Sequence, residues 1–167
     1  MKPIIFCILT VSDRSSQGLR EDLSGPKLME FIEDKGWHVL DYKIVPDEGY
    51  IIEKQLRDWC NSQSSPQVIL TTGGTGFAPR DVTPEATRKV IEREAPGLAE
   101  FIRLKGLESS PNSILSRGIA GIHNKTIIIN LPGSPKAAVE SISFISEILP
   151  HSVAILLEDR DAEAQHS

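Results

Sequence analysis

Short, continuous apolar runs alternate with amphipathic segments along most of this chain. The first run, 4–11, is apolar at nearly every position, as in a strand that is buried on both faces. Strand patterns recur at 38–45 and 68–70, and a segment with helical spacing lies between one strand and the next. This alternation predicts right-handed crossovers and a mostly parallel sheet that is covered by helices on both faces.

The second half of the chain adds a hairpin to this pattern. Two extended segments, 114–122 and 126–131, are joined only by residues 123–125, which are too few to hold a crossover helix. We therefore predict an antiparallel pair there. The expected fold class is a three-layer α/β/α arrangement with a mostly parallel central sheet plus a β-hairpin.

Helix starts are marked by a hydroxyl residue followed by proline. Thr83-Pro84 is expected to cap a helix that continues to the break at Pro96-Gly97, and Ser134-Pro135 a helix that ends at Pro150. Residues 15–23 read as a polar loop. Further helices are predicted from Ser24 to Gly36, around Ile52, Leu56 and Trp59, and from Leu98 to Leu104.

Composition restricts the possible partners. The 167 residues carry a net charge of −5 and only 5% aromatic side chains, which argues against a protein that binds polymeric nucleic acid. No apolar stretch approaches the roughly 20 residues that span a bilayer, and the two distant cysteines read as buried side chains. We expect a cytoplasmic protein with one domain, 1–157, and a polar, frayed tail, 158–167.

The sequence Thr71–Gly76 follows a buried strand and has three glycines within four positions. Such a loop lets backbone amides converge on a ligand, and a phosphate is the natural guest next to a helix N-terminus. It lacks the Gly-Lys-Ser/Thr ending of a Walker A loop. The alternative interpretation is a plain tight turn.

Two carboxylates follow strand ends near this loop. Asp81 lies just before a predicted helix, and Asp47 follows the second strand. Each has an ordinary explanation as a helix cap. Each could also hold a hard divalent cation against the phosphates of a ligand, which is the usual arrangement in Mg²⁺ sites.

Other candidate residues lie at the ends of the first and last strands. Ser12 and Asp13 end the first strand, and the rigid loop Asn130–Lys136 follows the last. Arg80 and Lys136 are candidate phosphate ligands, although such residues are often merely solvated. Ser116 lies in the predicted hairpin, and His38, His123 and His151 have no partners at metal-ligand spacing.

Six motifs occur in an order that resembles the molybdopterin-binding family, in particular its molybdopterin adenylyltransferases, which are related to the G domain of gephyrin. The resemblance covers about residues 4–157. The motifs are Leu-Thr-Val-Ser-Asp-Arg (9–14), Val-Pro-Asp-Glu (45–48), Thr-Gly-Gly-Thr-Gly (72–76), Arg-Asp-Val-Thr-Pro-Glu-Ala-Thr (80–87), Leu-Ser-Arg (115–117) and Asn-Leu-Pro-Gly-Ser-Pro-Lys (130–136).

The resemblance implies a reaction of molybdenum cofactor biosynthesis, in which molybdopterin and Mg-ATP give adenylyl-molybdopterin and pyrophosphate. It also implies a homotrimer and a downstream molybdenum-insertion protein. The family's two functional aspartates correspond to Asp47 and Asp81, which we expect to be catalytic and to bind Mg²⁺. The residues expected to bind phosphate or nucleotide are Gly73, Gly74, Thr75, Gly76, Asn130, Pro132, Gly133, Ser134 and Pro135, and those expected to bind substrate are Ser12, Asp13, Arg80, Ser116 and Lys136.

One position departs from the family pattern, because several members have serine where this chain has Gly106. If that serine holds the pterin, Ser109 or Ser110 would replace it here. Three other functions stay open: a paralogue that binds or carries molybdopterin without adenylylating it, a trimeric scaffold, and a nucleotide-cleaving enzyme of the competence-damage type. The retained Asp47 and Asp81 favour the enzyme over the carrier.

Overall fold

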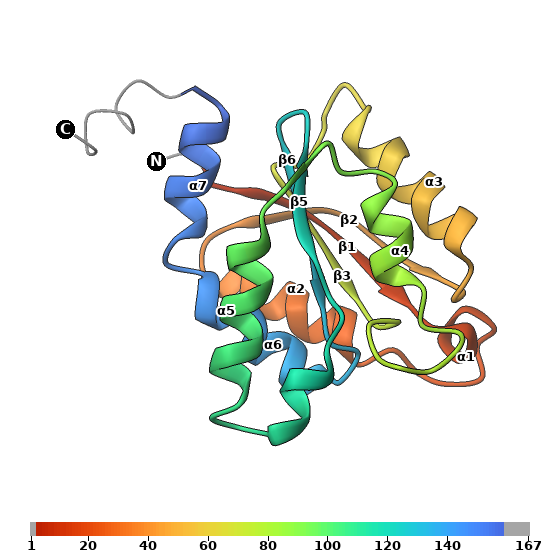
Figure 1. Ribbon diagram of the computed structural model, residues 1–167. Helices are drawn as coiled ribbons and strands as arrows, with labels where there is room; N and C mark the ends of the chain where they lie inside the picture. Colours follow the sequence, from red (N-terminus) through yellow and green to blue (C-terminus); the bar gives the residue numbers. More distant parts are fainter. Residues whose placement is uncertain (1–2, 159–167) are drawn as a thin grey trace.

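The computed structural model describes residues 3–158, so that all but the first residue of the predicted polar tail lies outside the described residues. Strands and helices alternate along most of the chain, as the sequence predicts (Figure 1). In chain order the elements are β1 (Ile5–Val11), α1 (Asp13–Ser16), α2 (Ser24–Asp34), β2 (His38–Val45), α3 (Gly49–Cys60), β3 (Val68–Thr72), α4 (Thr83–Arg88), β4 (Arg93–Glu94), α5 (Pro96–Gly106), the 3₁₀ helix η1 (Pro111–Leu115), β5 (Ala120–His123), β6 (Thr126–Leu131), α6 (Pro135–Ile145) and α7 (Leu149–Leu156).

The strands form one sheet in the order β2-β1-β3-β6-β5-β4. β2, β1, β3 and β6 are parallel neighbours, whereas β5 runs antiparallel to β6 and to β4. The predicted hairpin is therefore confirmed in β5 and β6. The chain moves from β1 to β2 on one side and to β3 on the other, and ligands of such sheets bind at the carboxyl ends of the strands beside this reversal.

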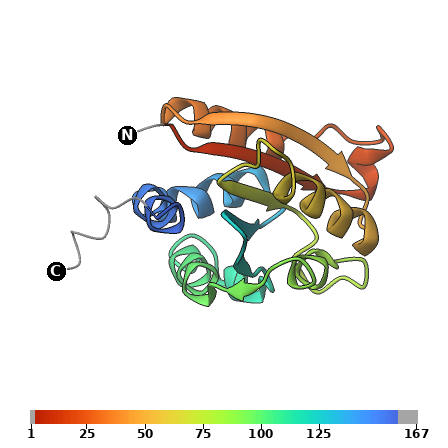
Figure 2. The ribbon, with the colours of Figure 1, turned by 90° about the horizontal axis from the view of Figure 1, so that it is seen from above.

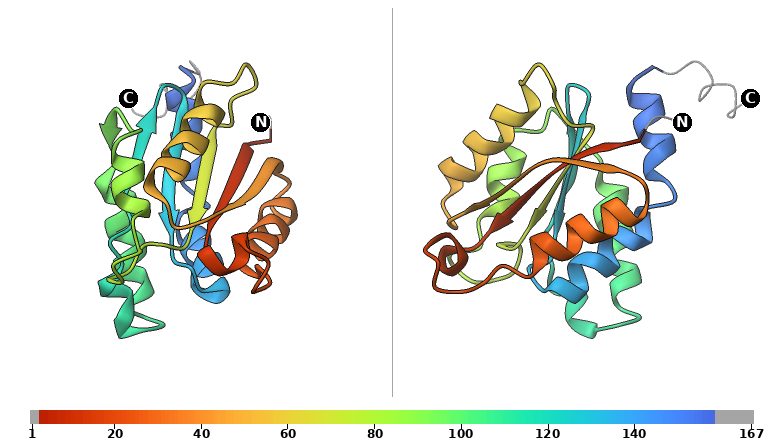
Figure 3. Two further views of the ribbon diagram at one scale, coloured as in Figure 1. Left: turned by 90° about the vertical axis from the view of Figure 1, so that its right-hand side faces the viewer. Right: turned by 180° about the vertical axis from the view of Figure 1, so that it is seen from behind.

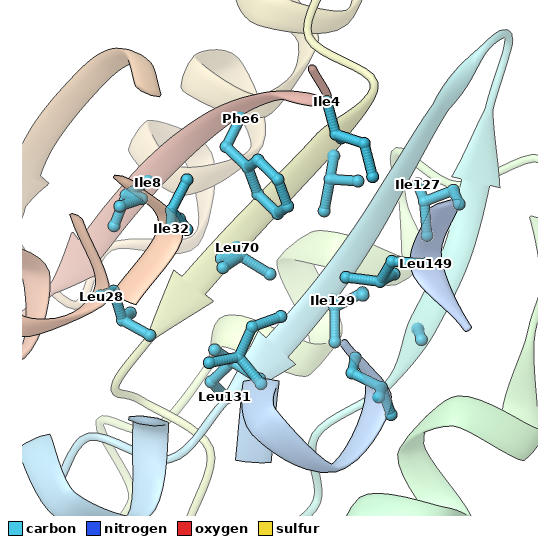
Figure 4. Close-up of a cluster of buried hydrophobic side chains, with 14 of the residues drawn as sticks. Ile4, Phe6, Ile8, Leu28, Ile32, Leu70, Ile127, Ile129, Leu131 and Leu149 are labelled. Carbon is cyan, nitrogen blue, oxygen red and sulfur yellow. The ribbon is translucent and has the colours of Figure 1, made fainter. Parts of the chain in front are cut away.

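Helices cover both faces of the sheet and create two cores, which confirms the three-layer prediction (Figures 2 and 3). α2, α5, α6 and α7 pack on one face around Phe6, Leu70 and Ile129 (Figure 4). α3 and α4 pack on the other face around Leu9 and Ile128. Both faces of β1, β3 and β6 are thus buried, which explains why these strands are continuously apolar in sequence.

The helix that starts at Thr83 is shorter than predicted. α4 ends at Arg88, and the chain then pairs with β5 through bonds from the Glu92 amide to the Ile122 carbonyl at 2.8 Å and from the Ala95 amide to the Ala120 carbonyl at 2.9 Å. The prediction of a helix up to Pro96 is therefore wrong. The apolar spacing after Arg88 serves packing next to a short edge strand, β4, rather than another helical turn.

The prediction of an extended segment at 114–122 is also mostly wrong, because the strand in this region is only Ala120–His123. Residues Pro111–Leu115 form η1, whose start resembles the other cap-and-proline starts: the Ser110 hydroxyl accepts a hydrogen bond from the Asn112 amide at 3.3 Å. Ser110-Pro111 is a signal that could have predicted this helix from the sequence.

Pro150 begins a helix instead of ending one. α6 ends at Ile145, a turn follows, and Pro150 occupies the first turn of α7, where a missing amide hydrogen costs nothing. Among residues 3–158 no single helix is long and apolar enough to cross a membrane; α6 and α7 pass that length and composition test only as a pair, across a 64° bend.

Candidate active site

The candidate site lies where the carboxyl ends of β1, β3 and β6 meet. The order β1-β3-β6 places the loops after Val11, Thr72 and Leu131 side by side. The Gly73 amide donates a hydrogen bond to the Leu131 carbonyl at 3.3 Å, and the Thr72 hydroxyl donates to the Pro132 carbonyl at 2.7 Å. The parallel sheet therefore brings three of the sequence motifs together at one edge.

Glycine is required at the two residues that leave β3. Gly73 has φ +102° and Gly74 has φ +64°, a region that favours glycine. A Cβ on Gly73 would lie 2.3 Å from the Val11 carbonyl oxygen, and one on Gly74 would lie 2.3 Å from Oγ1 of Thr83. The loop therefore needs glycine for close backbone approach as well as for its dihedral angles.

The three backbone amides after Gly73 lie beyond the end of β3. Within the described part of the chain, the amides of Gly74, Thr75 and Gly76 donate no hydrogen bond to another protein group. Free amides beside a cavity can bind the oxygens of an anion. Thr83, predicted as the cap of α4, is instead its first residue, and its hydroxyl donates to the Gly73 carbonyl at 2.9 Å.

Asp13 and Asp47 hold each other's backbone. The Asp13 amide donates to Oδ2 of Asp47 at 2.7 Å, and the Asp47 amide donates to Oδ1 of Asp13 at 3.0 Å. Asp47 is not the cap of α3, since Glu48 occupies that position. Asp13 begins α1, a short helix that is capped by Ser12 and overlaps the start of the loop predicted at 15–23. These bonds fix the Asp47 carboxylate relative to β1.

Arg80 is paired with acidic side chains. Its guanidinium donates to both carboxylate oxygens of Asp13, at 2.9 and 2.8 Å, and lies 3.0 Å from Oε1 of Glu48. This pairing lowers the pKa of Asp13, chiefly through the hydrogen bonds from Arg80. The sequence predicts that Arg80 binds a phosphate. In the structure its guanidinium already binds the carboxylates of Asp13 and Glu48, so a phosphate would have to bind beside these ion pairs.

Asp47 and Asp81 leave negative charge at the centre of the site. Burial raises the pKa of Asp47, and the charges of Asp13 and Asp81 add to this effect. The Asp81 carboxylate accepts a hydrogen bond from the Ala78 amide at 3.1 Å, and neither aspartate caps a helix, since Val82 holds that position before α4. Both carboxylates line the same polar cavity, where their like charges repel each other.

Two cavities meet at this centre. The smaller, about 330 Å³, is polar and includes Asp47 together with the end of β1. The larger, about 560 Å³, extends between α5, η1 and α6. The residues that line both are Gly74, Asp81, Gly133 and Ser134. Two molecules bound in these cavities would meet at the glycine loop and Asp81, an arrangement suited to group transfer between them.

Most of the other predicted residues line one of the two cavities, whereas Asp13 and Arg80 line neither. Ser12, Gly73 and Pro135 line the smaller cavity, and Thr75, Gly76, Pro132, Ser116 and Lys136 line the larger. Asn130 lines neither: its side chain is buried and donates to the hydroxyls of Thr71 and Thr87, each at 2.9 Å. Ser134 caps α6 as predicted, accepting from the Ala137 amide at 3.4 Å.

Gly106 lines the larger cavity and packs directly against Ser113. A Cβ at this position would lie 2.1 Å from Oγ of Ser113, which donates to the Arg103 carbonyl at 3.1 Å. Ser109, Ser110 and Ser113 all line the same cavity. The hydroxyl nearest to Gly106 therefore belongs to Ser113, a residue that the sequence motifs do not single out.

Sequence reasoning also missed Asp22, and it included Arg117 in the Leu-Ser-Arg motif without predicting a role for it. Asp22 lines the smaller cavity and accepts hydrogen bonds from the Thr10 hydroxyl at 2.6 Å and from the Tyr42 hydroxyl. Arg117 binds the loop that carries Asp81. Asp22 precedes the Ser24-Gly25-Pro26 helix start, which is a signal for a capping carboxylate. No local pattern identifies the partners of Arg117.

Comparisons with known proteins agree with this geometry. Residues 7–151 match the family described as probable molybdopterin binding domain. A molybdopterin adenylyltransferase of Helicobacter pylori (strain J99) is 43% identical over 159 residues, which are 94% of this chain and 90% of that protein. The molybdenum cofactor synthesis protein cinnamon of Drosophila melanogaster is 47% identical over 161 residues, but this chain spans only 26% of its length.

A solved structure supports the same relationship. The crystal structure of a molybdopterin biosynthesis enzyme from Thermus thermophilus superposes with a TM-score of 0.86 at 46% sequence identity, and the match covers 92% of this chain and 96% of that chain. Sequence and fold therefore agree over nearly the whole length of both proteins. The glycine loop, the paired aspartates and the two cavities thus belong to a member of the molybdopterin-binding domain family.

Proposed function

We propose that this protein is a molybdopterin adenylyltransferase that acts in molybdenum cofactor biosynthesis and uses Mg-ATP. The observation that carries the proposal is the meeting of two cavities at the glycine loop and Asp81. An adenylyl transfer needs two phosphorylated molecules whose reacting groups are in contact. The names and the high coverage of relatives such as the Helicobacter pylori enzyme support the same reaction.

The reaction is a displacement at phosphorus. An oxygen of the terminal phosphate of molybdopterin attacks the α-phosphorus of ATP, a new P–O bond forms, and the bond to the bridging oxygen breaks. Pyrophosphate leaves and carries the electron pair of that bond. Because both reactants are anionic, the protein's main tasks are positioning and charge neutralisation. The amides of Gly74, Thr75 and Gly76 would bind phosphate oxygens at the point where the cavities join.

The residues present fit a magnesium ion. Mg²⁺ prefers oxygen ligands and commonly binds through one or two carboxylates together with phosphates and water. Asp47 and Asp81 supply two carboxylates, and the pKa of Asp47 is raised by burial and, to a smaller extent, by the negative charges of Asp13 and Asp81. These two residues would hold the ion. When bound, Mg²⁺ would neutralise phosphate charge and make the α-phosphorus easier to attack.

The two cavities differ in a way that suggests which substrate each takes. We assign the ATP phosphates to the smaller cavity, because it contains Asp47 and the end of β1 with Ser12. We assign the pterin to the larger cavity, which has room between α5 and α6 and several serine hydroxyls. Lys136 is well exposed at its rim, where its ammonium group would meet a phosphate.

Direct product analysis tests the proposed reaction. The purified protein is incubated with molybdopterin, ATP and Mg²⁺, and pyrophosphate and adenylylated pterin are quantified by chromatography against a reaction without protein. We expect both products in equal amounts. If molybdopterin binds but no product forms, the protein is a carrier and the enzymatic proposal is wrong.

Asp81→Asn tests which carboxylate serves the reaction. Asparagine has the same shape and its carbonyl oxygen can keep the bond from the Ala78 amide, so the fold should persist. The loss of one charge at the reacting phosphates should lower kcat by about a hundredfold or more. Steady-state kinetics, with binding of molybdopterin as a folding control, measure the effect. Wild-type kcat in this variant would remove Asp81 from the mechanism.

We also infer a cytoplasmic homotrimer that passes its product to a molybdenum-insertion protein. Large apolar side chains on α5 and the adjacent η1 support self-association, since Phe101, Leu104 and Ile114 are 41%, 62% and 56% exposed. Sedimentation equilibrium of the purified chain measures the assembly. A monomeric mass at micromolar concentration would contradict the homotrimer.

A further inference from the structure

The turn that carries Asp81 has little apolar packing of its own. Residues 77–80 are all exposed, and the Phe77 side chain is 70% exposed. Inside the turn, the Asp81 amide donates to the Ala78 carbonyl at 2.9 Å, and the Ala78 amide donates back to the Asp81 carboxylate. These local bonds set the shape of the turn, and Arg80 ties the turn to Asp13 and Glu48 through its exposed side chain.

Arg117 holds the backbone at both ends of the turn. Its Nε donates to the Gly76 carbonyl at 2.7 Å, and its Nη2 donates to the Asp81 carbonyl at 2.6 Å. Its backbone amide also donates to the Thr75 carbonyl at 2.8 Å. One residue of a distant segment therefore fixes both the glycine loop and the backbone of Asp81.

The guanidinium is itself held in place. Its Nη1 binds Oε1 of Glu85, on the first turn of α4, and the other carboxylate oxygen lies 3.5 Å from Nη2. The backbone on either side of Arg117 is held by Arg103 of α5, whose Nη1 donates to the Gly118 carbonyl at 2.7 Å and the Ser116 carbonyl at 3.3 Å. The Arg117 side chain is only 35% exposed.

We propose that Arg117 is a positioning residue, which holds the Asp81 carboxylate and the amides of the glycine loop in the geometry that adenylyl transfer requires. This inference rests on the proposed function. A planar guanidinium can bind two carbonyls and a carboxylate at once, which a lysine ammonium on a flexible stem cannot do with the same geometry. Loss of such support typically lowers metal affinity or activity by about 10- to 100-fold.

The test compares Arg117→Lys and Arg117→Gln with Arg88→Gln as the matched control. Arg88 also lies on the α4 side of the site and pairs with a glutamate, Glu94, but this pair is more than half exposed and touches neither cavity. We expect both Arg117 variants to lower kcat by about 10- to 100-fold and to raise the Mg²⁺ concentration that gives half the maximal rate. Arg88→Gln should match the wild type in both.

Two further measurements do not depend on activity. Amide hydrogen exchange should be faster in the Arg117 variants at Ala78, Asp81 and Thr83, whose amides are hydrogen-bonded in the wild type, and unchanged in the sheet. Calorimetric titration with Mg-ATP should show weaker binding to the variants than to the wild type. If neither Arg117 variant folds, Glu85→Gln, which leaves the two carbonyl bonds in place, should give the same changes at a smaller size.

The outcomes separate this proposal from the proposed function. Wild-type kcat, Mg²⁺ dependence and Mg-ATP affinity in Arg117→Lys would overturn the positioning role, even if local exchange became faster. If the wild type forms no adenylylated pterin, the proposed function fails, and the titration with Mg-ATP then decides: weaker binding to the variants supports the positioning of Asp81, and equal binding overturns it.

Discussion

At the scale of single residues, the sequence places polar side chains at strand ends, and the structure brings these ends to one edge of the sheet, but the partners of the side chains are not evident from the sequence. Arg80 binds Asp13 and Glu48, and Asn130 binds two buried hydroxyls. A buried polar group must find a hydrogen-bond partner, and that partner is usually distant in sequence. The sequence therefore locates these residues without stating what they contact.

The pair of Glu85 and Arg117 predicts a dependence of stability on pH. The hydrogen bond from Arg117 holds the pKa of Glu85 below its ordinary value of 4.5, so the folded protein binds this proton less readily than the unfolded chain. The resulting stabilisation is complete above the unfolded-state pKa and is lost as the pH falls through the lower folded-state pKa. Wild type should therefore be more stable than Glu85→Gln near neutral pH, and this advantage should shrink as the pH falls below 4.5, the ordinary pKa of the carboxyl.

Urea denaturation of both proteins across this range measures the difference. Glu100→Gln is the control, because Glu100 is exposed and makes no ion pair among the described residues. That variant should match the wild type throughout. A Glu85→Gln deficit that persists unchanged in acid would mean that the carboxylate charge is not the source of the stability.

At the scale of elements, helices and strands with strong apolar periodicity are predicted well. Elements whose ends depend on contacts with other parts of the fold are not. β2 has the predicted ends, and the hairpin of β5 and β6 is confirmed. The predicted end of α4 is wrong because the residues after Arg88 pair with β5 instead of continuing the helix. A pattern of neighbouring residues in the sequence does not reveal this pairing, because β5 is distant in the chain. Short elements such as η1 depend on contacts with the helix before them.

The start of α2 offers a test at this scale. Asp22, which lies one residue before the N-cap Leu23, accepts hydrogen bonds from the Ser24 amide at 2.9 Å and from the hydroxyls of Thr10 and Tyr42, so that it joins the first turn of the helix to β1 and β2. Asp22→Ala should lower the free energy of unfolding by about 2 to 4 kcal/mol, since it removes the hydrogen bond to the first turn of the helix and leaves partly buried donors unpaired.

Chemical denaturation measures this loss, with Asp34→Ala as the control. Asp34 is the last residue of α2, is exposed and makes no side-chain hydrogen bond within the described chain. Its removal should change stability by less than about 0.5 kcal/mol. Equal losses in the two variants would show that Asp22 contributes only as an ordinary surface charge.

At the scale of the whole molecule, both cysteines are sealed into the core between the sheet and α3. Burial raises the pKa of the Cys7 thiol to about 12 and that of Cys60 to about 11. A thiol that is buried and protonated reacts only when the protein opens. We expect no labelling of the native protein by a thiol reagent within minutes, and labelling of two thiols in denaturant.

The rate of native-state labelling should follow stability, so that it rises in Asp22→Ala. Labelling is read by mass spectrometry on the intact chain. Rapid modification of one thiol in the native protein, at a rate independent of stability, would show that the core opens locally around that cysteine.

The sequence by itself determined the alternation of strands and helices, the hairpin and the edge of the sheet at which the site lies. It could do so because apolar periodicity is local and because parallel strands must end at one edge. Only the tertiary structure decided the two cavities that share Asp81, the contact of Gly106 with Ser113, and the anchoring of the Asp81 turn by Arg117. Each of these depends on packing between segments far apart in the chain, and no local pattern encodes it.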